Sequence, residues 1–499
     1  MLFIVAPPGS GGELLASMLP GPPRVVATVA EGLAVDAEAR FVYVYRDPSA
    51  AATAEETAQA WARSTEGLLD ELETLAPERW CVTSYDRLIA DREGELARIS
   101  NFAGIEARPR RATPEEAQRA ASRARELFAK MPGERVRVER QPPSFESVHT
   151  STLAEILYGL RASLIVTTYQ SGRVILVRAQ DAKTLNTHFR TFPMPMGVAM
   201  RVDAELSPTG QKQVGGLANQ RSQSYRLALG TRTGIWDYRN QPDLAPKIEP
   251  KGTHDACLVP RNMHVTGDIR VHELAFADDE LWLVNTRFSA LCTIDRDRSF
   301  VPRWRPPFVT KLVPEDRCHL NGMCIVDSRI AYVTALGETD SDNGWRENKA
   351  RGGIVIDVAS GETILRGLSM PHSPRFHDGR LWLLESGKGT LSVVEDGTVR
   401  TVTELPGFTR GLAFAGPFAF VGLSQVRESN IFGGIPLVDR VPERRCGVWV
   451  VDTRTGNVVA FLRFEGTVQE IFDVQVLHGV RYPELLEPTN ELVGGSFTL

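Results

Sequence analysis

The stretch MPHSPRFHDGRLWLLESG, residues 370–387, has a design that recurs along the chain. It combines a polar pair, a β-strand, an Asp/Gly turn and a second, apolar strand. The same design is present in RVHELAFADDELWLVNTR (270–287), HLNGMCIVDSRIAYVTAL (319–336) and FTRGLAFAGPFAFVGLSQ (408–425). PMPMGVAMRVD (193–203) and TVQEIFDVQVLHG (467–479) fit its first half. The chain therefore contains an internal β repeat.

The spacing of the repeat identifies the architecture. Its six leading positions are Met196, His272, Asn321, His372, Arg410 and Gln469. Most are about 40–60 residues apart, which is the length of a propeller blade. The longer first interval contains the polar insertion SPTGQKQVGGLANQRSQS, which is typical of a surface loop. The sequence predicts an all-β six-bladed propeller.

Half-blades at the two ends of the repeat indicate how the ring closes. After TVQEIFDVQV the chain has no three further strands to complete a blade. Residues 164–192, LIVTTYQSGRVILVRAQDAKTLNTHFRTF, supply outer strands without an innermost strand of their own. We expect the C-terminal strand to complete the N-terminal blade, which removes an open sheet edge.

Composition excludes some functions. The 499-residue chain has a formal net charge of -5, which gives no general attraction to nucleic acid or to an anionic membrane. No apolar run reaches the roughly 20 residues needed to span a bilayer, and the N-terminus lacks the features of a signal peptide. The six cysteines form no CxxC pair, as expected for a reduced compartment. We expect a cytoplasmic protein without nucleic-acid or membrane partners.

The first 105 residues have a different pattern. LFIVAPPGSGGELLASML (2–19) reads as a strand, a glycine turn and a helix, and FVYVYRDPSAA (41–51) as a second strand. With CVTSYDRLIADREGELARISNFAGI (81–105), these segments resemble the sulfotransferase family, which implies a small α/β P-loop domain that grips the phosphates of a sulfate donor. Glu13 lies where a phosphate would bind, and its carboxylate disfavours an anion there. We therefore expect no bound nucleotide and a non-catalytic domain that serves packing, homodimer formation or partner docking.

These patterns divide the chain into three parts. We predict a degenerate sulfotransferase-like domain over residues 1–110, a helix and linker over 111–150, and the propeller over 151–499. Thr152 and Glu155 form a capping box that predicts a short helix before the first propeller strand.

The C-terminal two-thirds also resembles a bacterial β-propeller family of unknown function. The matching stretches include NTRFSALCTID, EDRCHLNG, GLSMPHSPR and LPGFTRGL. This resemblance implies the propeller fold and no particular activity.

Propeller geometry brings the candidate site residues together. The start of each innermost strand and the end of the second strand lie at the same mouth of the central channel. The candidate metal ligands there are His264, His272, His319 and His372. The candidate catalytic residues are Arg287, Arg410, Glu338 and Glu385. The candidate substrate-binding residues are Asn285, Asn321, Trp345, Arg346, Arg427 and Glu470.

Three functions fit these residue types. Clustered imidazoles suit zinc, copper or iron, with Asp268, Glu338 or Glu385 completing the ligand set. Arginines would bind an anionic group of a small-molecule or peptide substrate, beneath a lid over residues 336–353. The leading hypothesis is a metal-dependent enzyme. The first alternative is metal-free group transfer by His372 or His272, with a layout similar to that of propeller arylsulfate sulfotransferases. The second is a non-catalytic binding module, in which the N-terminal domain and the propeller jointly present a surface to a ligand or partner. A purely structural reading also fits, because polar residues at a channel mouth often only satisfy hydrogen bonds between blades.

Overall fold

The chain divides into two compact units, Met1–Pro142 and Pro143–Leu499. The computed structural model describes the backbone of four strands in the first unit, and residues 144–203, 224–425 and 434–497 in the second. No helix among these residues is long and apolar enough to cross a membrane.

The described strands of the first unit form a parallel sheet in the order β2-β1-β3-β4. The strands are β1 (Leu2–Val5), β2 (Arg24–Val26), β3 (Arg40–Tyr45) and β4 (Trp80–Ser84). Strands β1 and β3 coincide with the two strands predicted from the sequence. The predicted glycine turn, Glu13 and the helix of the linker lie outside the described residues, as does the likeness to a sulfotransferase that depends on them.

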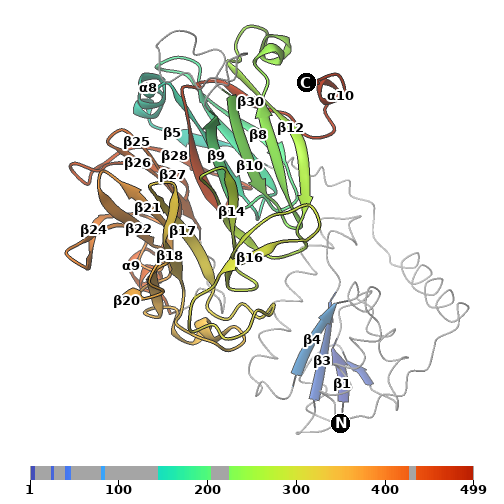
Figure 1. The fold of residues 1–499 in the computed structure, drawn as a ribbon, viewed down its shortest axis with the longest axis vertical. Coiled ribbons are helices and arrows are strands. Elements are labelled where there is room, and N and C mark those ends of the chain that lie inside the picture. The colour runs from blue at the N-terminus through green and yellow to red at the C-terminus, as the bar shows by residue number, and fades with distance from the viewer. Residues whose placement is uncertain are drawn as a thin grey trace, which may run out of the picture. The chain divides into compact units, whose positions relative to one another are not determined.

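The second unit is a six-bladed β-propeller, as predicted (Figure 1). Blade 1 contains, from the inside outward, β29 (Asp473–His478), β6 (Ala162–Thr168), β7 (Arg173–Ala179) and β8 (Leu185–Thr191). Blade 2 contains β9 (Val198–Asp203), β10 (Ser224–Gly230), β11 (Gly234–Asn240), β12 (Ala256–Val265) and β30 (Pro483–Leu485). Blade 3 contains β13 (Val271–Ala277), β14 (Glu280–Asn285), β15 (Ala290–Thr293) and β16 (Val301–Trp304).

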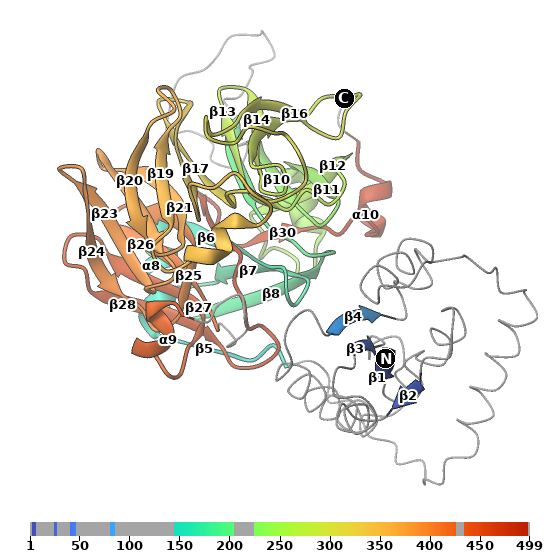
Figure 2. The same cartoon turned by 90° about the horizontal axis from the view of Figure 1, so that it is seen from below.

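The remaining blades repeat this order. Blade 4 contains β17 (Leu320–Val326), β18 (Arg329–Ala335), β19 (Gly353–Asp357) and β20 (Thr363–Leu368). Blade 5 contains β21 (Pro371–His377), β22 (Arg380–Glu385), β23 (Thr390–Glu395) and β24 (Thr398–Glu404). Blade 6 contains β25 (Phe408–Ala415), β26 (Phe418–Ser424), β27 (Cys446–Asp452), β28 (Val458–Phe464) and β5 (Ser147–His149). Figure 2 shows β17, β21 and β25 toward the middle of the ring and β23 and β24 toward its outside.

Apolar side chains hold neighbouring blades face to face. Trp382 and Leu384 of blade 5 pack in one buried cluster with Leu412 and Val421 of blade 6. Large side chains that are fully buried each stabilise a fold by roughly 1.5–3 kcal/mol relative to exposure. The propeller core is therefore a ring of such layers between the sheets.

The ring closes as the half-blades predicted. Strand β29 pairs antiparallel with β6, from Asp473 opposite Thr167 to His478 opposite Ala162. The inner strand begins at Asp473, so Gln469 and Glu470 belong to the segment before it. Beyond β29, strand β30 adds to the outer edge of blade 2, where it pairs with β12 (Figure 1).

A buried ion cluster fastens β30, and we call it the Glu484 clasp. The Glu484 carboxylate lies 2.9 Å from Arg190 Nη2 and 3.6 Å from Arg178 Nη1. The ring nitrogens of His188 and His254 lie 3.4 and 3.6 Å from it. Burial alone would raise the pKa of Glu484, but the contacts with both histidines and the charge of Arg190 hold this pKa far below its ordinary value. The clasp is therefore charged at neutral pH.

Hydroxyl groups link the innermost parts of successive blades. Each donates a hydrogen bond to a carbonyl oxygen at the start of the next innermost strand or just before it. The four bonds are Thr167 Oγ1 to Met196 O (2.6 Å), Thr286 Oγ1 to Leu320 O (2.6 Å), Ser386 Oγ to Thr409 O (2.5 Å) and Ser424 Oγ to Ile471 O (3.1 Å). We call these bonds the interblade links.

Helix α8 (Ser151–Leu160) precedes β6 as expected, but the predicted capping box does not form. Its N-cap is Thr150, whose side chain makes no cap hydrogen bond. The Thr152 hydroxyl instead donates to Val459 O at 2.9 Å, which ties the helix to β28. A tertiary partner has replaced the local one.

Candidate functional site

Bulges open the innermost strands of blades 3 to 6. Pairing with the second strand shifts register between Val271 and Leu274 in β13, and corresponding shifts occur near the starts of β17, β21 and β25. A bulge leaves residues unpaired and redirects their side chains. The strand pairing also shows that the sequence alignment of the repeats is off by one residue in blade 6. Thr409, and not Arg410, occupies the position equivalent to His372.

His272 follows the first paired residue of β13. Its Nδ1 lies 2.8 Å from Thr286 Oγ1, and that hydroxyl donates its own hydrogen to Leu320 O. Nδ1 therefore carries a proton, and Nε2 keeps its lone pair. Burial, reinforced by the positive charge of Arg410, lowers the pKa of His272 well below its ordinary value. The imidazole is neutral at pH 7.

His372 repeats this arrangement in β21. Its Nδ1 lies 2.9 Å from Ser386 Oγ and 3.0 Å from Met370 O, while Ser386 donates to Thr409 O. Burial and the charge of Arg410 lower the pKa of His372 as well. Its Nδ1 thus holds the local turn, whereas no described residue hydrogen-bonds to Nε2.

His319 lies between blades 3 and 4 and has a charged partner. Its Nδ1 lies 2.9 and 3.1 Å from the two carboxylate oxygens of Asp316, which also accepts from Arg270 Nη1 at 3.1 Å. The His319 ring packs against Trp345, with 4.4 Å between centroids, and edge-on against His272 at 4.8 Å. An Asp–His pair of this kind fixes the orientation of the ring.

Arg410 supplies a buried positive charge beside these rings. Its guanidinium lies 3.5 Å from the ring centroid of Phe472, which also contacts His272 at 5.3 Å. Nη2 is buried, and among the described residues Arg410 has no hydrogen bond or ion pair. Burial lowers the pKa of Arg410 to about 10, so it remains charged at pH 7. His272, His319, His372 and Arg410 form the histidine–arginine cluster.

Tyr169 and Glu470 border this cluster. The Tyr169 ring lies 5.5 Å from that of Phe472, edge to face. Burial and the charge of Glu470 raise the pKa of Tyr169, which keeps its hydroxyl protonated. The charge of Glu470 acts on Arg410, as do those of Asp473 and Glu273. Glu470 therefore lies beside the cluster, where it interacts with Tyr169 and Arg410 of the protein itself.

A second group of charges, the acid–arginine group, lies on the same innermost strands. Glu273 of β13 forms an ion pair with Arg375 of β21, and its Oε2 accepts from the Met323 amide at 2.9 Å. Asp473 Oδ2 accepts from the Val198 amide at 2.9 Å. Burial raises the pKa of Glu273 to about 7 despite Arg375, and burial also raises that of Asp473.

Other candidates lie away from the histidine–arginine cluster. His264 is on β12, and its Nε2 lies 2.9 Å from Ser299 O. Arg287 pairs with Asp268 at 3.0 Å. Glu338 pairs with Arg366 of the outermost strand β20 at 2.7 Å. Propeller geometry predicts which backbone segments end at the channel mouth. It does not predict side-chain direction, and these three side chains contact the partners named above instead.

Several predicted residues instead complete the local structure. Asn285 Oδ1 accepts from the Phe288 amide at 3.1 Å, and Glu385 accepts from the Ser369 amide at 3.1 Å and pairs with Lys388.

The other predicted substrate-binding residues differ in position, and among the described ones only Trp345 contacts the cluster. Asn321 Nδ2 donates to Pro371 O at 3.0 Å and links blade 4 to blade 5. Trp345, in the short helix η4 (Gly344–Asn348), is buried against His319, while the exposed Arg346 lies over the outer side of its ring. Arg427 lies outside the described residues.

The arrangement does not close around a metal ion. Within the described parts of the chain, no three His, Cys, Asp or Glu side chains are grouped so that they hold a metal. Nε2 of His272 and Nε2 of His372 carry the lone pair that a metal requires, but the rings of His272 and His319 contact each other edge-on. The cluster as it stands consists of three imidazoles and a guanidinium, and the imidazoles of His272 and His372 are neutral at pH 7.

Sequence reasoning missed the residues that orient the cluster. Thr286 and Ser386 occupy the same place in two copies of the repeat, immediately after the second strand. Asp316 stands three residues before His319, within reach of the same turn. These signals are visible once the copies are aligned on the ends of their second strands.

Comparison with known proteins assigns a family. The model of a domain of unknown function, DUF4915, matches residues 151–486, and the chain belongs to this family. No curated protein matches the sequence.

Solved structures similar to the chain include several proteins of low sequence identity. One is a chain of a nidogen–laminin complex, with 8% identity, 64% of this chain and 99% of that chain covered, and a TM-score of 0.38. A gluconolactonase from Xanthomonas campestris has 12% identity, coverage of 61% and 86%, and a TM-score of 0.34. A PQQ-bound aldose sugar dehydrogenase from Streptomyces coelicolor has 13% identity, coverage of 65% and 100%, and a TM-score of 0.33.

Proposed function

We propose that this member of the DUF4915 family is a metal-free transferase that moves a sulfuryl or phosphoryl group from a small donor ester at the histidine–arginine cluster. The observation that carries the proposal is Arg410, a buried cation whose charge acts on the imidazoles of His272 and His372. Its Nη2 has no hydrogen-bond partner among the described residues, and the carboxylates of Glu470, Asp473 and Glu273 act on it through their charge without a described ion pair. A buried guanidinium with unmet hydrogen bonds is costly, and an oxyanion of a ligand would satisfy them.

Arg410 sets the class of substrate. A guanidinium binds the oxygens of sulfate, phosphate or carboxylate through paired hydrogen bonds. The guanidinium lies over the Phe472 ring, and its buried Nη2 has an unused hydrogen-bond donor that such an oxyanion would accept. In a site of low dielectric constant, this contact stabilises charge that develops on the transferred group.

His372 is the best-placed nucleophile. The carbonyl of Met370 and the hydroxyl of Ser386 both hold its Nδ1–H, so Nε2 presents a lone pair. The Met370 carbonyl also stabilises the positive charge that the ring acquires when Nε2 forms a bond. The corresponding carbonyl at His272, that of Arg270, is more distant at 3.4 Å.

His319 provides the proton. In this scheme His319 enters the reaction protonated on both ring nitrogens. Nε2 of His372 bonds to the sulfur or phosphorus as the ester bond breaks, and the leaving oxygen takes the electron pair of that bond and the Nε2 proton of His319. An acceptor hydroxyl or water then attacks the transferred group, returns a proton to His319 and restores the lone pair of His372. Asp316 holds the His319 ring in one orientation through both steps.

The metal-dependent alternative uses the same atoms. His272, His319 and His372 would hold zinc, copper or iron through Nε2, with Nδ1 of each ring already bonded, as in known metal sites. The metal would act as a Lewis acid or redox centre toward an anion on Arg410. This alternative requires the rings to rearrange, since no described trio is grouped around a common centre.

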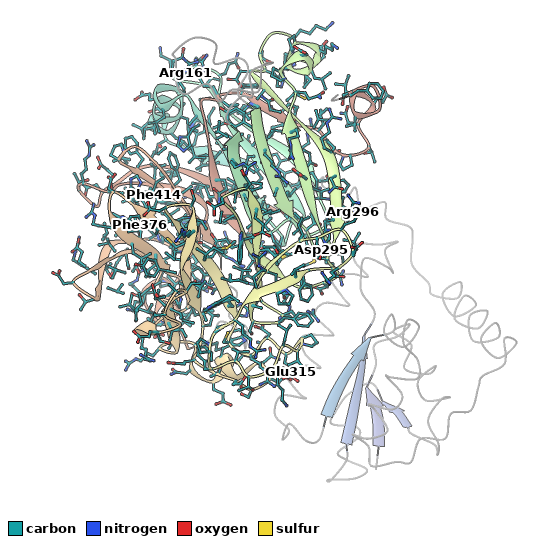
Figure 3. All side chains as sticks on the ribbon, viewed as in Figure 1. Arg161, Asp295, Arg296, Glu315, Phe376 and Phe414 are labelled. Atoms are coloured by element: carbon teal, nitrogen blue, oxygen red, sulfur yellow. The ribbon has the colours of Figure 1, made fainter. Side chains whose placement is uncertain are left out.

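One experiment separates the two functions. The full chain, purified without a histidine tag, is analysed for metals and assayed with 4-nitrophenyl sulfate plus phenol and with 4-nitrophenyl phosphate. We expect activity without bound metal that survives chelator, and a loss of roughly 10²–10³ in kcat/KM for Arg410→Lys and more for His372→Ala. His377→Ala is the control, because His377 lies at the other end of β21 from His372 and stacks on Phe414. Figure 3 labels Phe414 and Phe376, the residue before His377. Bound metal in stoichiometric amount together with chelator-sensitive activity, or no effect of His372→Ala, would contradict the proposal.

A further inference from the structure

The interblade links differ in what donates to their hydroxyl groups. In blades 1 and 6, Thr167 Oγ1 accepts from the Asp473 amide at 3.1 Å and Ser424 Oγ from the Ile471 amide at 2.9 Å. In blades 3 and 5, Thr286 and Ser386 accept from a histidine Nδ1 instead. The hydroxyl oxygen of the link therefore accepts from a backbone amide in blades 1 and 6 and from an imidazole in blades 3 and 5.

The single hydrogen of a hydroxyl group fixes which atom donates in the histidine blades. A hydroxyl has one hydrogen, and in both histidine blades it is donated to the carbonyl of the next blade. The oxygen can only accept from the ring, so Nδ1 must carry the hydrogen. A chain of two hydrogen bonds thus connects each ring to its neighbouring blade.

From this geometry we propose that Thr286 and Ser386 are positioning residues that fix the tautomer and ring orientation of His272 and His372. The role rests on the proposed function, because a fixed Nδ1–H tautomer keeps Nε2 as the reactive atom. It also extends that function, because the hydroxyl group that links two blades then orients the reactive imidazole as well. Neither residue contacts the transferred group in this scheme.

The two histidines depend on their hydroxyls to different degrees. His372 Nδ1 also lies 3.0 Å from Met370 O, a partner that can only accept. The equivalent distance from His272 Nδ1 to Arg270 O is 3.4 Å, at the limit of a hydrogen bond. Thr286 should therefore control His272 more strongly than Ser386 controls His372.

The test measures imidazole tautomers in the full chain labelled with 15N-histidine. We expect Thr286→Val to replace the single Nδ1–H pattern of His272 with a mixture, and Thr286→Ser to restore it. Ser386→Ala should leave His372 mainly in the Nδ1–H form and lower kcat/KM about tenfold through looser orientation. Signals are assigned with His272→Gln and His372→Gln.

Ser424→Ala is the matched structural control, because it removes an interblade link that has no histidine. It should lower Tm about as much as Ser386→Ala and leave both tautomer patterns unchanged. An unaltered His272 pattern in Thr286→Val, or altered patterns in Ser424→Ala, would overturn the inference. Since the tautomer is measured without substrate, absence of transferase activity would count against the proposed function alone.

Discussion

The Glu484 clasp and the histidine–arginine cluster contain the same types of cationic residue, histidine and arginine. They differ in whether a carboxylate forms an ion pair with the arginine. Each gathers histidines and arginine, but the clasp joins outer strands of blades 1 and 2 and places a buried carboxylate at its centre. In the cluster, Arg410 Nη2 has no hydrogen-bond partner among the described residues, and the carboxylates of Glu470, Asp473 and Glu273 act on Arg410 without a described ion pair. Removing one partner of a buried ion pair is strongly destabilising, whereas a buried group whose hydrogen bonds are unmet marks a candidate site. The contrast separates a structural ion cluster from a candidate site.

Removal of the Glu484 carboxylate should have the largest effect. Glu484→Gln leaves Arg178 and Arg190 without their anion, so we expect a loss of about 3–5 kcal/mol in the free energy of unfolding. Urea denaturation measures it. Asp237→Asn is the control, because Asp237 also pairs with two arginines but its side chain is 17% exposed, against 3% for Glu484. Equal losses in the two variants would remove the basis of the comparison.

Removing the arginine of the histidine–arginine cluster should instead raise the free energy of unfolding. Arg410→Met removes the unpaired cation and keeps an apolar contact with Phe472, so the free energy of unfolding should rise by about 1–2 kcal/mol while transferase activity is lost. The same denaturation experiment and the assay with 4-nitrophenyl sulfate measure the two effects. A destabilised Arg410→Met would mean that the guanidinium has a protein partner.

The acid–arginine group, which has two acids for one arginine, should show a smaller effect that depends on pH. Because burial raises the pKa of Glu273 to about 7, the folded state holds a proton that the unfolded chain releases near the ordinary pKa of 4.5. The contribution of Glu273 to stability is therefore complete below pH 4.5 and is lost as the pH rises toward 7.

Glu273→Gln should accordingly flatten the pH dependence of Tm between pH 4.5 and 7. The wild-type Tm, measured by differential scanning calorimetry, should decline more steeply over this interval. A variant whose profile runs parallel to that of the wild type would show that Glu273 is ionised throughout.

The repeat predicted the fold because copies of one strand pattern at the spacing of a blade must form a ring. The starts of the innermost strands and the loops before them meet in the structure, and there His272, His319 and His372 lie near one another, whereas Arg410 is one residue beyond the position equivalent to His372. Strand spacing alone does not give side-chain direction, because a bulge or one residue of register turns a side chain to another face. His264 and Glu338 were misplaced for this reason.

Partners from distant segments were beyond prediction. Phe472 precedes the inner strand of blade 1, and Tyr169 follows β6 in the same blade, so neither stands at a leading position of the repeat. Their contact arises only when β29 joins β6 across the closure. The charge balance of Arg410 also depends on every neighbour at once, and no local pattern encodes it.

Closure by β29 has a consequence for synthesis on the ribosome. The hydrogen bond from the Asp473 amide to the Thr167 hydroxyl joins residues 306 positions apart. At roughly 5–20 residues per second, β6 leaves the ribosome about 15–60 seconds before its inner partner exists. During that interval a strand whose residues are all buried in the finished ring has an open edge. We expect nascent chains to engage a chaperone at β6 and to be released only once β29 has emerged.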